Sequence, residues 1–156
     1  MAKIKLSNVR LSFPSLFRKA TFEGNETKYE ATFMLHKEEH ADVIAEIKKQ
    51  IAAGIKENLK GAKVPADKIA LKDGDESGRD EYEGYYTLKA ANNKRPKVIN
   101  RDKTPLTEDD EVIYSGCYVN AVVDPWYQAN AYGKRVNFNL LGVQFFKDGE
   151  PFEPGS

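Results

Sequence analysis

Two long runs of alternating apolar and polar residues change phase part-way along, and this constrains the fold more than any other feature. In Lys3–Phe13 the apolar positions change phase near Asn8, and in Arg135–Phe146 they change phase at Gly142. A one-residue slip in a period-2 pattern is typical of a β-bulge, which lets a long strand bend. The sequence therefore predicts long, coiled strands rather than a flat sheet.

The remaining strands and loops are read from alternation and turn residues. The predicted further strands are Tyr29–Leu35, a short piece at Ile69–Leu71, Glu83–Ala91, Lys97–Asn100 and Val112–Val123. The predicted loops are Phe13–Lys28, with its turn at Gly24-Asn25, Val64–Asp80, Thr104–Glu111 and Asp124–Lys134. Leaving aside the short piece at Ile69–Leu71, these and the two bulged runs give five or six strands that are long enough to coil.

One helix is predicted over Lys37–Lys60. Its isoleucines and one leucine recur every three or four residues, which makes a single apolar stripe. Gly61 stands where a helix C-cap belongs. Long bent strands with one amphipathic helix favour a mainly β, OB-fold-like barrel of five or six strands, and a helix-on-sheet α+β domain is the alternative. The helix follows the second strand, whereas an OB-fold usually places it after the third.

The length of 156 residues predicts a single domain, which we place at residues 1–150, with 151–156 as a C-terminal tail or a remnant of cloning. The chain has no apolar run long enough to span a membrane and no signal peptide, so a cytoplasmic location is expected. The single cysteine, Cys117, excludes an intrachain disulfide and a cysteine-based zinc site.

Charge is balanced over the chain but segregated along it. There are 24 basic and 24 acidic residues, so the net charge is zero. Lys94–Lys103 nevertheless holds five bases and one acid, and Asp73–Glu83 holds six acids and one base. Because salt screens distant charges, a local basic stripe can bind phosphates whatever the total charge is.

Enzyme-like patterns are few. His36–His40 matches the H-x-x-E-H motif of zinc proteases, but His36 ends a strand pattern and the motif needs a helix, so a charged junction is favoured. The acidic runs could hold magnesium in a nuclease, although solvated loop charge is the simpler interpretation. No phosphate-binding glycine loop or nucleophile elbow occurs, and Cys117 is expected to be a buried thiol. We therefore expect neither catalysis, nor a metal, nor a cofactor.

Nucleic-acid binding is favoured by bases interleaved with aromatic rings. Lysine and arginine neutralise phosphates, and bases stack on exposed rings without needing a defined sequence. A predicted hairpin loop would bring three aromatic rings beside two cations, and exposed apolar surface of this kind usually marks a partner site. The candidate binding residues are Lys94, Arg95, Lys97, Arg101, Tyr118, Trp126, Tyr127, Tyr132, Lys134, Arg135 and Asn137.

The segment from Asn92 to Gly149 resembles a family of phage single-stranded DNA-binding proteins that was long filed as a domain of unknown function. The resemblance rests on R-P-x-V-x-x-R at Arg95–Arg101, on Y-S-G-C-Y-V-N-A at Tyr114–Ala121 and on the run Gly133–Phe145. It implies an OB-fold, distantly similar to podophage replication proteins of this function. It also implies a non-catalytic role in coating unwound strands during replication, recombination and repair. A long acidic tail, frequent in such proteins, is not seen after Lys147.

The functional expectation is therefore a sequence-nonspecific single-stranded DNA-binding protein of a bacteriophage, acting in the host cytoplasm. Double-stranded DNA as a second ligand, phage replication proteins as partners and a homodimer stay open, and no membrane partner is expected. The alternatives are a metal-dependent nuclease and a virion assembly protein.

Overall fold

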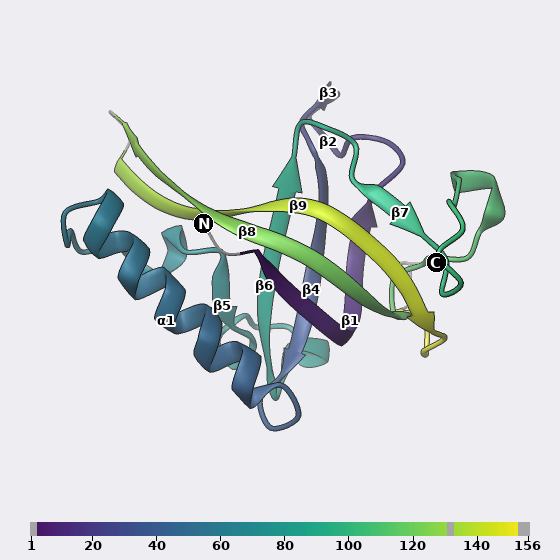
Figure 1. Cartoon of the computed structure of the whole chain (residues 1–156), viewed down its shortest axis with the longest axis horizontal. Coiled ribbons are helices and arrows are strands. Elements are labelled where there is room, and N and C mark those ends of the chain that lie inside the picture. The colour runs from purple at the N-terminus through teal and green to yellow at the C-terminus, as the bar shows by residue number, and fades with distance from the viewer. Residues whose placement is uncertain (1–2, 131–132, 153–156) are drawn as a thin grey trace.

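The computed structural model describes residues 3–130 and 133–152, which form a coiled sheet wrapped into a barrel with one long helix beside it (Figure 1). The strands are β1 (Ile4–Ser15), β2 (Thr21–Phe22), β3 (Asn25–Glu26), β4 (Tyr29–His36), β5 (Leu71–Asp73), β6 (Tyr85–Asn92), β7 (Lys97–Ile99), β8 (Tyr118–Asn130) and β9 (Gly133–Lys147). The helix is α1 (Ala41–Asn58). Single 3-10 turns lie at Ala66–Lys68, Gly74–Glu76, Asp80–Tyr82 and Glu108–Asp110.

Five strands close the barrel. Neighbouring strands pair in the order β6-β4-β1-β8-β9, and β9 returns to β6 through a parallel contact between Ala91 and Asn139. Two short strands extend the sheet, β5 beside β6 and β7 beside β9. A closed five-stranded barrel is the OB-fold architecture. The predicted fold class is confirmed, with α1 between the second and third barrel strands as the sequence indicated.

Both predicted bulges are present. In β1 the pairing with β8 shifts between Leu6 and Val9, and Asn8 adopts a left-handed φ of 54°. In β9 Val122 pairs with Gly142 and Val123 with Leu140, so the extra residue falls beside Gly142. These shifts add the local bend that a barrel of long strands needs.

The predicted hairpin around Trp126 is wrong in its boundaries. Val112–Cys117 is not part of a strand, and β8 begins at Tyr118 and continues to Asn130, through most of the predicted loop. Two turn-like residues explain the error. Asp124 accepts a hydrogen bond from Asn139 Nδ2 at 2.9 Å across the hairpin. Pro125 faces Phe138 beyond Val123, where the pairing of β8 with β1 ends, so its missing N–H costs no ladder bond there.

Three other boundaries also differ. The helix begins at Ala41 rather than Lys37, because residues 37–40 form a turn that His40 ends as the N-cap. The loop predicted before Lys28 contains the β2–β3 hairpin, whose turn residues Glu23 and Gly24 both have positive φ. The predicted piece at Ile69–Leu71 lies slightly later, as β5.

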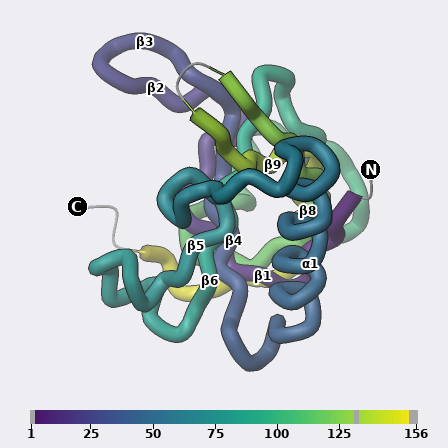
Figure 2. Tube along the Cα trace, turned by 90° about the vertical axis from the view of Figure 1, so that its left-hand side faces the viewer, coloured from purple at the N-terminus to yellow at the C-terminus, as the bar shows by residue number. Residues whose placement is uncertain are grey.

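The apolar stripe of α1 covers the barrel core. Ile44, Ile47 and Ile51 are buried with the inward side chains of the strands, among which Phe33 and Phe138 are the largest. The helix ends at Asn58 with Leu59 as its C-cap, and Gly61, in the left-handed region, donates its N–H to Ile55 O at 3.1 Å. Figure 2 shows α1 on the side of the barrel from which the β8–β9 hairpin also projects.

Tyr127 joins this hairpin to the helix. Its hydroxyl donates to the backbone oxygen of Gln50 at 3.0 Å, and its ring lies on Gly54. A Cβ at Gly54 would come within 1.9 Å of the Tyr127 ring, so only glycine allows this approach. Burial raises the pKa of the Tyr127 hydroxyl, with a smaller contribution from Glu57.

Replacing Gly54 with alanine tests this contact. Glycine to alanine inside a helix normally stabilises by up to about 1 kcal/mol. Here we expect Gly54→Ala to lower the free energy of unfolding by about 1–3 kcal/mol, because the new methyl overlaps the ring. Urea unfolding measures it. In a Tyr127→Ala background, Gly54→Ala should no longer lower the free energy of unfolding. If Gly54→Ala alone stabilised the protein, the packing of Tyr127 on Gly54 would be contradicted.

Candidate nucleic-acid interface

A groove of about 640 Å³ opens on the outer face of the barrel. Strands β4 and β6 form its floor, and the β8–β9 hairpin and the segment 67–72 form its walls. We call it the Trp126 groove. It is lined by Thr27, Lys28, Glu30, Thr32, Asp67, Lys68, Ile69, Ala70, Lys72, Tyr82, Thr87, Lys89, Ala91, Trp126, Gln128, Arg135, Val136, Asn137 and Phe138. In an OB-fold this face, between the second and third strands, is the one used for oligonucleotides.

Trp126 stands in one wall of the groove. It pairs with Asn137 across the β8–β9 ladder, and the Lys28 Nζ atom lies 5.7 Å from the centroid of its ring. Asn137 Nδ2 donates to Gln128 Oε1 at 3.3 Å, which fixes the amides beside the ring. The ring is half-buried, so part of it stays available to the groove. An indole held in this way can stack on a base.

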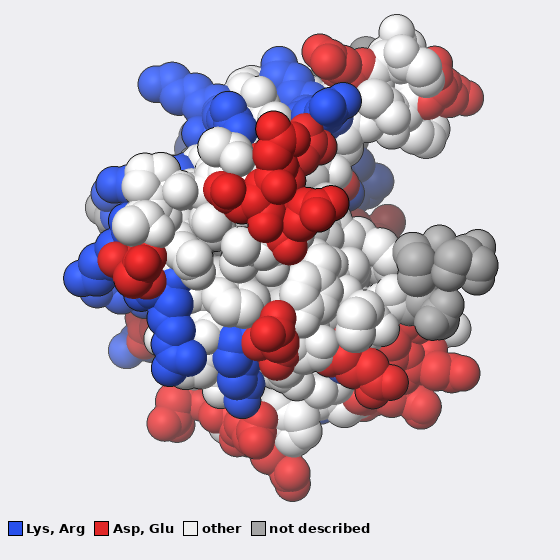
Figure 3. All heavy atoms as spheres, turned by 90° about the vertical axis from the view of Figure 1, so that its right-hand side faces the viewer, with Lys and Arg blue, Asp and Glu red and all other residues white. Residues whose placement is uncertain are grey.

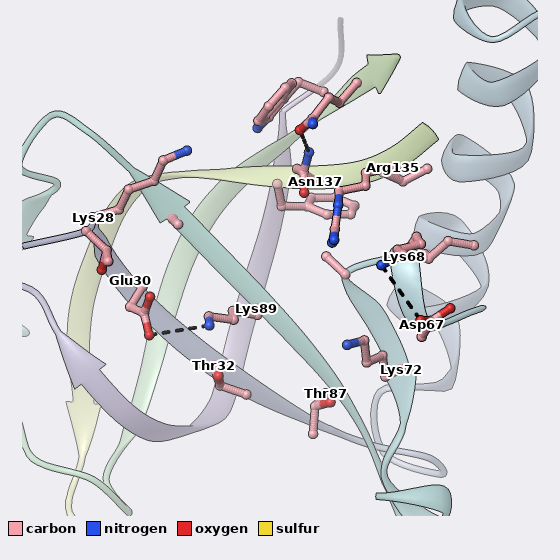
Figure 4. Close-up of a pocket in the computed structure, with 18 of the residues that line it drawn as sticks. Lys28, Glu30, Thr32, Asp67, Lys68, Lys72, Thr87, Lys89, Arg135 and Asn137 are labelled. Carbon is pink, nitrogen blue, oxygen red and sulfur yellow. Dashed lines mark hydrogen bonds and ion pairs between the residues drawn. The ribbon is translucent and has the colours of Figure 1, made fainter. Parts of the chain in front are cut away.

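The groove carries an excess of positive charge. Five of its lining residues are basic and two are acidic. Lys89 pairs with Glu30 at 3.5 Å and Lys68 with Asp67 at 3.9 Å. No carboxylate of residues 3–130 and 133–152 forms an ion pair with the other three cations, Lys28, Lys72 and Arg135. Figure 4 shows the lysines and Arg135 pointing into the groove from different strands and loops.

Small side chains cover the floor between these cations. Thr32 on β4 and Thr87 on β6 face the groove, with Ala70 and Ala91 beside them. Small residues leave room for a flat ring to approach the sheet. The threonine hydroxyls can donate to and accept from a ligand. The floor therefore suits a base edge better than a bulky apolar ligand.

Tyr82 closes the end of the groove away from Trp126. It comes from the loop 74–84, and its hydroxyl lies 2.7 Å from Ser12 Oγ over the outer face of the barrel. Gly74 lets the loop fold tightly, since a Cβ there would come within 2.2 Å of Tyr82 O. This ring is buried although it lies outside the barrel.

An ion-pair clasp holds the loop that carries Tyr82. Lys37 Nζ donates to Asp73 Oδ1 at 2.7 Å and to Asp75 Oδ2 at 2.5 Å, and Lys37 N donates to Gly84 O. The hydrogen bonds from Lys37 lower the pKa of both carboxyls below their ordinary value, and backbone N–H groups lower them further. The same two carboxylates raise the pKa of Lys37. This acidic loop is therefore structural rather than a free metal-binding run.

Three of the predicted binding residues meet in the Trp126 groove: Trp126, Arg135 and Asn137. They share a face because Trp126 pairs with Asn137 and Gln128 pairs with Arg135 across the hairpin. Lys134 is exposed next to them on β9 but is not part of the lining. Tyr127 points to the opposite side of β8, under α1, and Tyr132 lies outside the described residues.

The predicted basic stripe lies elsewhere. Arg95 stacks on Phe17 and Arg101 on Phe146, with guanidinium-to-ring distances of 5.6 and 4.9 Å, and Lys94 is in the turn before β7. Lys97 lines a second, smaller groove of about 380 Å³ with Lys5. Figure 3 faces the side of β7 and shows Lys and Arg along the upper and left margins of this face, with Asp and Glu clusters beside and below them. Tyr118 lies beside Arg10 and Lys147 at the start of β8.

Four lysines of the Trp126 groove were missed by the sequence analysis: Lys28, Lys68, Lys72 and Lys89. They come from three separate segments, since Lys68 and Lys72 share the segment 67–72, and Lys72 adjoins the acidic run Asp73–Glu83, which masks its charge. Only Lys89 carried a usable signal, because it alternates with Thr87 and Tyr85 on one face of a strand. The sheet pairing that brings the others to it is not a local property of the sequence.

The histidine motif is a structural junction. His36 Nδ1 accepts from the backbone N–H groups of Glu38 and Glu39, at 3.2 Å each, and His40 Nδ1 accepts from His36 N at 2.8 Å. With Nδ1 accepting, His40 Nε2 donates to Asn8 O at 3.1 Å. Both rings are thus committed to the backbone. Among the residues that the structure describes, no group of three His, Cys, Asp or Glu could hold a metal ion.

The model of one protein family, described as the Enterobacter phage Enc34 ssDNA-binding protein, matches residues 2–156. The chain belongs to this family. Putative protein p50 of Acyrthosiphon pisum secondary endosymbiont phage 1 is 42% identical over 163 residues, which cover 98% of this chain and 88% of that protein. The predicted phage family is thereby confirmed.

Solved structures agree with the family. The single-stranded DNA-binding protein from bacteriophage Enc34 in complex with ssDNA superimposes with a TM-score of 0.88 at 40% identity, over 97% of this chain and 89% of that one. The gp2.5 single-stranded DNA-binding protein of bacteriophage T7 has a TM-score of 0.60 at 11% identity, over 100% and 97% of the two chains. That second likeness shows the fold alone. The family is one of binding proteins, so the expectation of a non-enzymatic chain is confirmed.

Within residues 3–130 and 133–152, no helix is both long and apolar enough to cross a membrane.

The clasp predicts how stability depends on pH. Asp73 and Asp75 have lowered pKa values, so their contribution is present above the ordinary value of 3.8 and is lost as the pH falls through the folded values. The contribution of Lys37, whose pKa is raised, is present below 10.5 and is lost only at higher pH. We expect Lys37→Met to flatten the acid limb of the stability curve.

Urea midpoints measured between about pH 7 and pH 2 check this. The matched control is Lys49→Met on the exposed face of α1, which should keep the acid slope of the parent protein. If stability fell equally with pH in Lys37→Met and in the parent protein, the ion-pair clasp would not be the cause of the acid sensitivity.

Proposed function

We propose that this chain binds single-stranded DNA without sequence preference, in the Trp126 groove. The observation that carries the proposal is the meeting of a half-exposed indole with three cations on the outer face between β4 and β6, none of which forms an ion pair within the part of the chain that the structure describes. The relative from phage Enc34, solved with ssDNA, supports it through membership of the same family. The bound strand would lie across the sheet, because the barrel interior is filled by side chains.

Each part of the groove has a role. Lys28, Lys72 and Arg135 would neutralise phosphates and release counterions, which gives affinity that does not depend on sequence. Trp126 would stack on a base, and every base has a face on which to stack. The threonines of the floor would bond to whichever base edge comes near. Phosphate neutralisation and stacking do not select one base, so discrimination between sequences should be weak.

The basic stripe is proposed as a flanking contact rather than the centre of the site. Lys94, Arg95, Lys97, Arg101 and Lys134 are all exposed and could follow the phosphates of a longer strand. Asn137 is proposed to position Gln128 beside the base, and Tyr132 remains a proposed stacking residue. Tyr127 is left out, because α1 covers its ring.

The biological role proposed is to coat and protect unwound DNA during phage replication, recombination and repair, in the host cytoplasm. Residues 1–150 would form the DNA-binding domain. Phage replication proteins are the proposed protein partners. Binding to double-stranded DNA and formation of a homodimer are the further possibilities to be tested, by competition with a duplex and by sedimentation.

Salt-titrated binding to oligonucleotides of several sequences tests the electrostatic part of the proposal. We expect similar affinities for all of them, falling steeply with salt. Arg135→Gln and Lys72→Gln should each reduce the slope of log K against log salt by about 0.7, the value for one contact to a single strand. Lys49→Gln, outside the groove, should leave it unchanged. Affinity independent of salt would rule the mechanism out.

Fluorescence tests the stacking part, since Trp126 is the sole tryptophan. Adding single-stranded DNA should quench its emission. Trp126→Ala should weaken binding by about 1–3 kcal/mol, the usual value for one base on one ring. Trp126→Phe, which keeps an aromatic face, should lose less. If Trp126→Ala bound DNA as tightly as the parent protein, Trp126 would not be the residue on which the base stacks.

A further inference from the structure

A second cluster of rings and cations lies beyond Tyr82, outside the Trp126 groove. We call it the Phe13 patch, and it comprises Arg10, Phe13, Arg79, Tyr118, Lys147 and Phe152. We propose that the path of single-stranded DNA continues over Tyr82 onto this patch, which would be a second stacking and phosphate subsite. The inference rests on the proposed function, because it extends the same DNA path.

The patch interleaves cations with rings. Arg79 Cζ lies 5.2 Å from the Phe13 centroid, Arg10 Cζ lies 4.2 Å from that of Phe152, and Lys147 Nζ lies 4.9 Å from that of Tyr118. Phe13 and Phe152 are stacked with centroids 6.4 Å apart. Bases can stack on such rings and on guanidinium planes while the cations meet phosphates. This is the chemistry of a single-stranded nucleic-acid surface, assembled from distant segments.

Phe13 is unusual in two ways. Its side chain is 45% exposed, although it is large and apolar. Its backbone has a φ of 49°, in the left-handed region, where a bulky residue is rare. Strained backbone of this kind gathers at functional sites. Ser115 Oγ accepts a hydrogen bond from Phe13 N at 3.0 Å, so the strained conformation is held in place.

The patch is continuous with the groove. Arg10 pairs with Met34 and Met34 with Thr87, which lies on the groove floor, so Arg10 is in the same row of the same outer face. Tyr82 lines the groove on one side, and on the other Arg79 lies 5.8 Å from its ring. A strand that passes Thr87 therefore meets the patch after crossing one tyrosine.

The charge of the patch favours DNA over a protein partner. It contributes three cations, and of the carboxylates in the described residues only Glu81 forms an ion pair with one of them, to Arg79 at 3.8 Å. The Arg10 guanidinium instead donates to backbone oxygens of Gly116 and Glu150. Arg10 and Lys147 form no ion pair with any carboxylate of the described residues, and such a surface next to a groove of the same sign suits a continuous polyanion.

Oligonucleotides of two lengths separate this site from the groove. One OB-fold covers about 4–16 nucleotides, so a strand of about 4 can fill the groove alone and one of about 12 can reach the patch. Phe13→Leu keeps an apolar side chain but removes the ring, and should weaken binding of the longer strand by about fivefold or more while leaving the shorter unchanged. Lys147→Gln should lower the salt slope for the longer strand by about 0.7, and the control Lys56→Gln, on α1, should not.

A fluorescence measurement gives an independent readout. In a Trp126→Phe background, Phe13→Trp places the sole indole on the patch, and the longer strand should quench it while the shorter does not. Thermal unfolding of each variant confirms that it folds. The proposal of a second DNA subsite would be overturned if the variants bound the longer strand as the parent does, or if they lost equal affinity for both lengths. It would also be overturned if they changed sedimentation without changing DNA binding. If the parent protein bound neither strand, the proposed function itself would fail instead.

Discussion

The bulge at Asn8 is the constraint on which the barrel depends. Before it, β1 pairs with β8, and from Arg10 onward β1 also pairs with β4, so the strand turns from one part of the sheet to the other there. The freed backbone groups are satisfied by side chains: Asn8 N donates to Asn120 Oδ1 at 2.9 Å, and Asn8 O accepts from His40 Nε2. Without these bonds the bend would expose unpaired backbone polar groups.

Closure decides where a ligand can lie. Since Phe33, Phe138 and the isoleucines of α1 fill the interior, function is confined to the outer face. Every second residue of β4 and β6 reaches that face, which is why small polar residues and Lys89 occupy it. The loop that carries Tyr82 then covers the part of the outer face where the Trp126 groove meets the Phe13 patch. Its clasp to Lys37, at the end of β4, ties this boundary to the barrel.

The sequence predicts what is encoded locally. The phase slips at Asn8 and Gly142 and the stripe of α1 are visible as periods, so the barrel, its bends and its helix were predictable. The extent of the β8–β9 hairpin was not predictable. Asp124 and Pro125 are residue types that are common in turns, but here both are paired with residues of β9 and belong to a strand. The groove cations were also not predictable as a group, since Lys28, Lys72 and Lys89 meet only after the strands pair.

The neighbours Trp126 and Tyr127 show why counting aromatic residues in the sequence overestimates the number of rings at a binding surface. Both look equally able to stack on a base in the sequence, and both lie on one strand. Because side chains alternate, Trp126 faces the groove while Tyr127 lies on Gly54 under the helix. Tyr127 holds the β8–β9 hairpin against α1, and the hairpin held in this way places Trp126 in the groove. A binding ring therefore depends on a structural ring beside it, and substituting either should weaken DNA binding for different physical reasons.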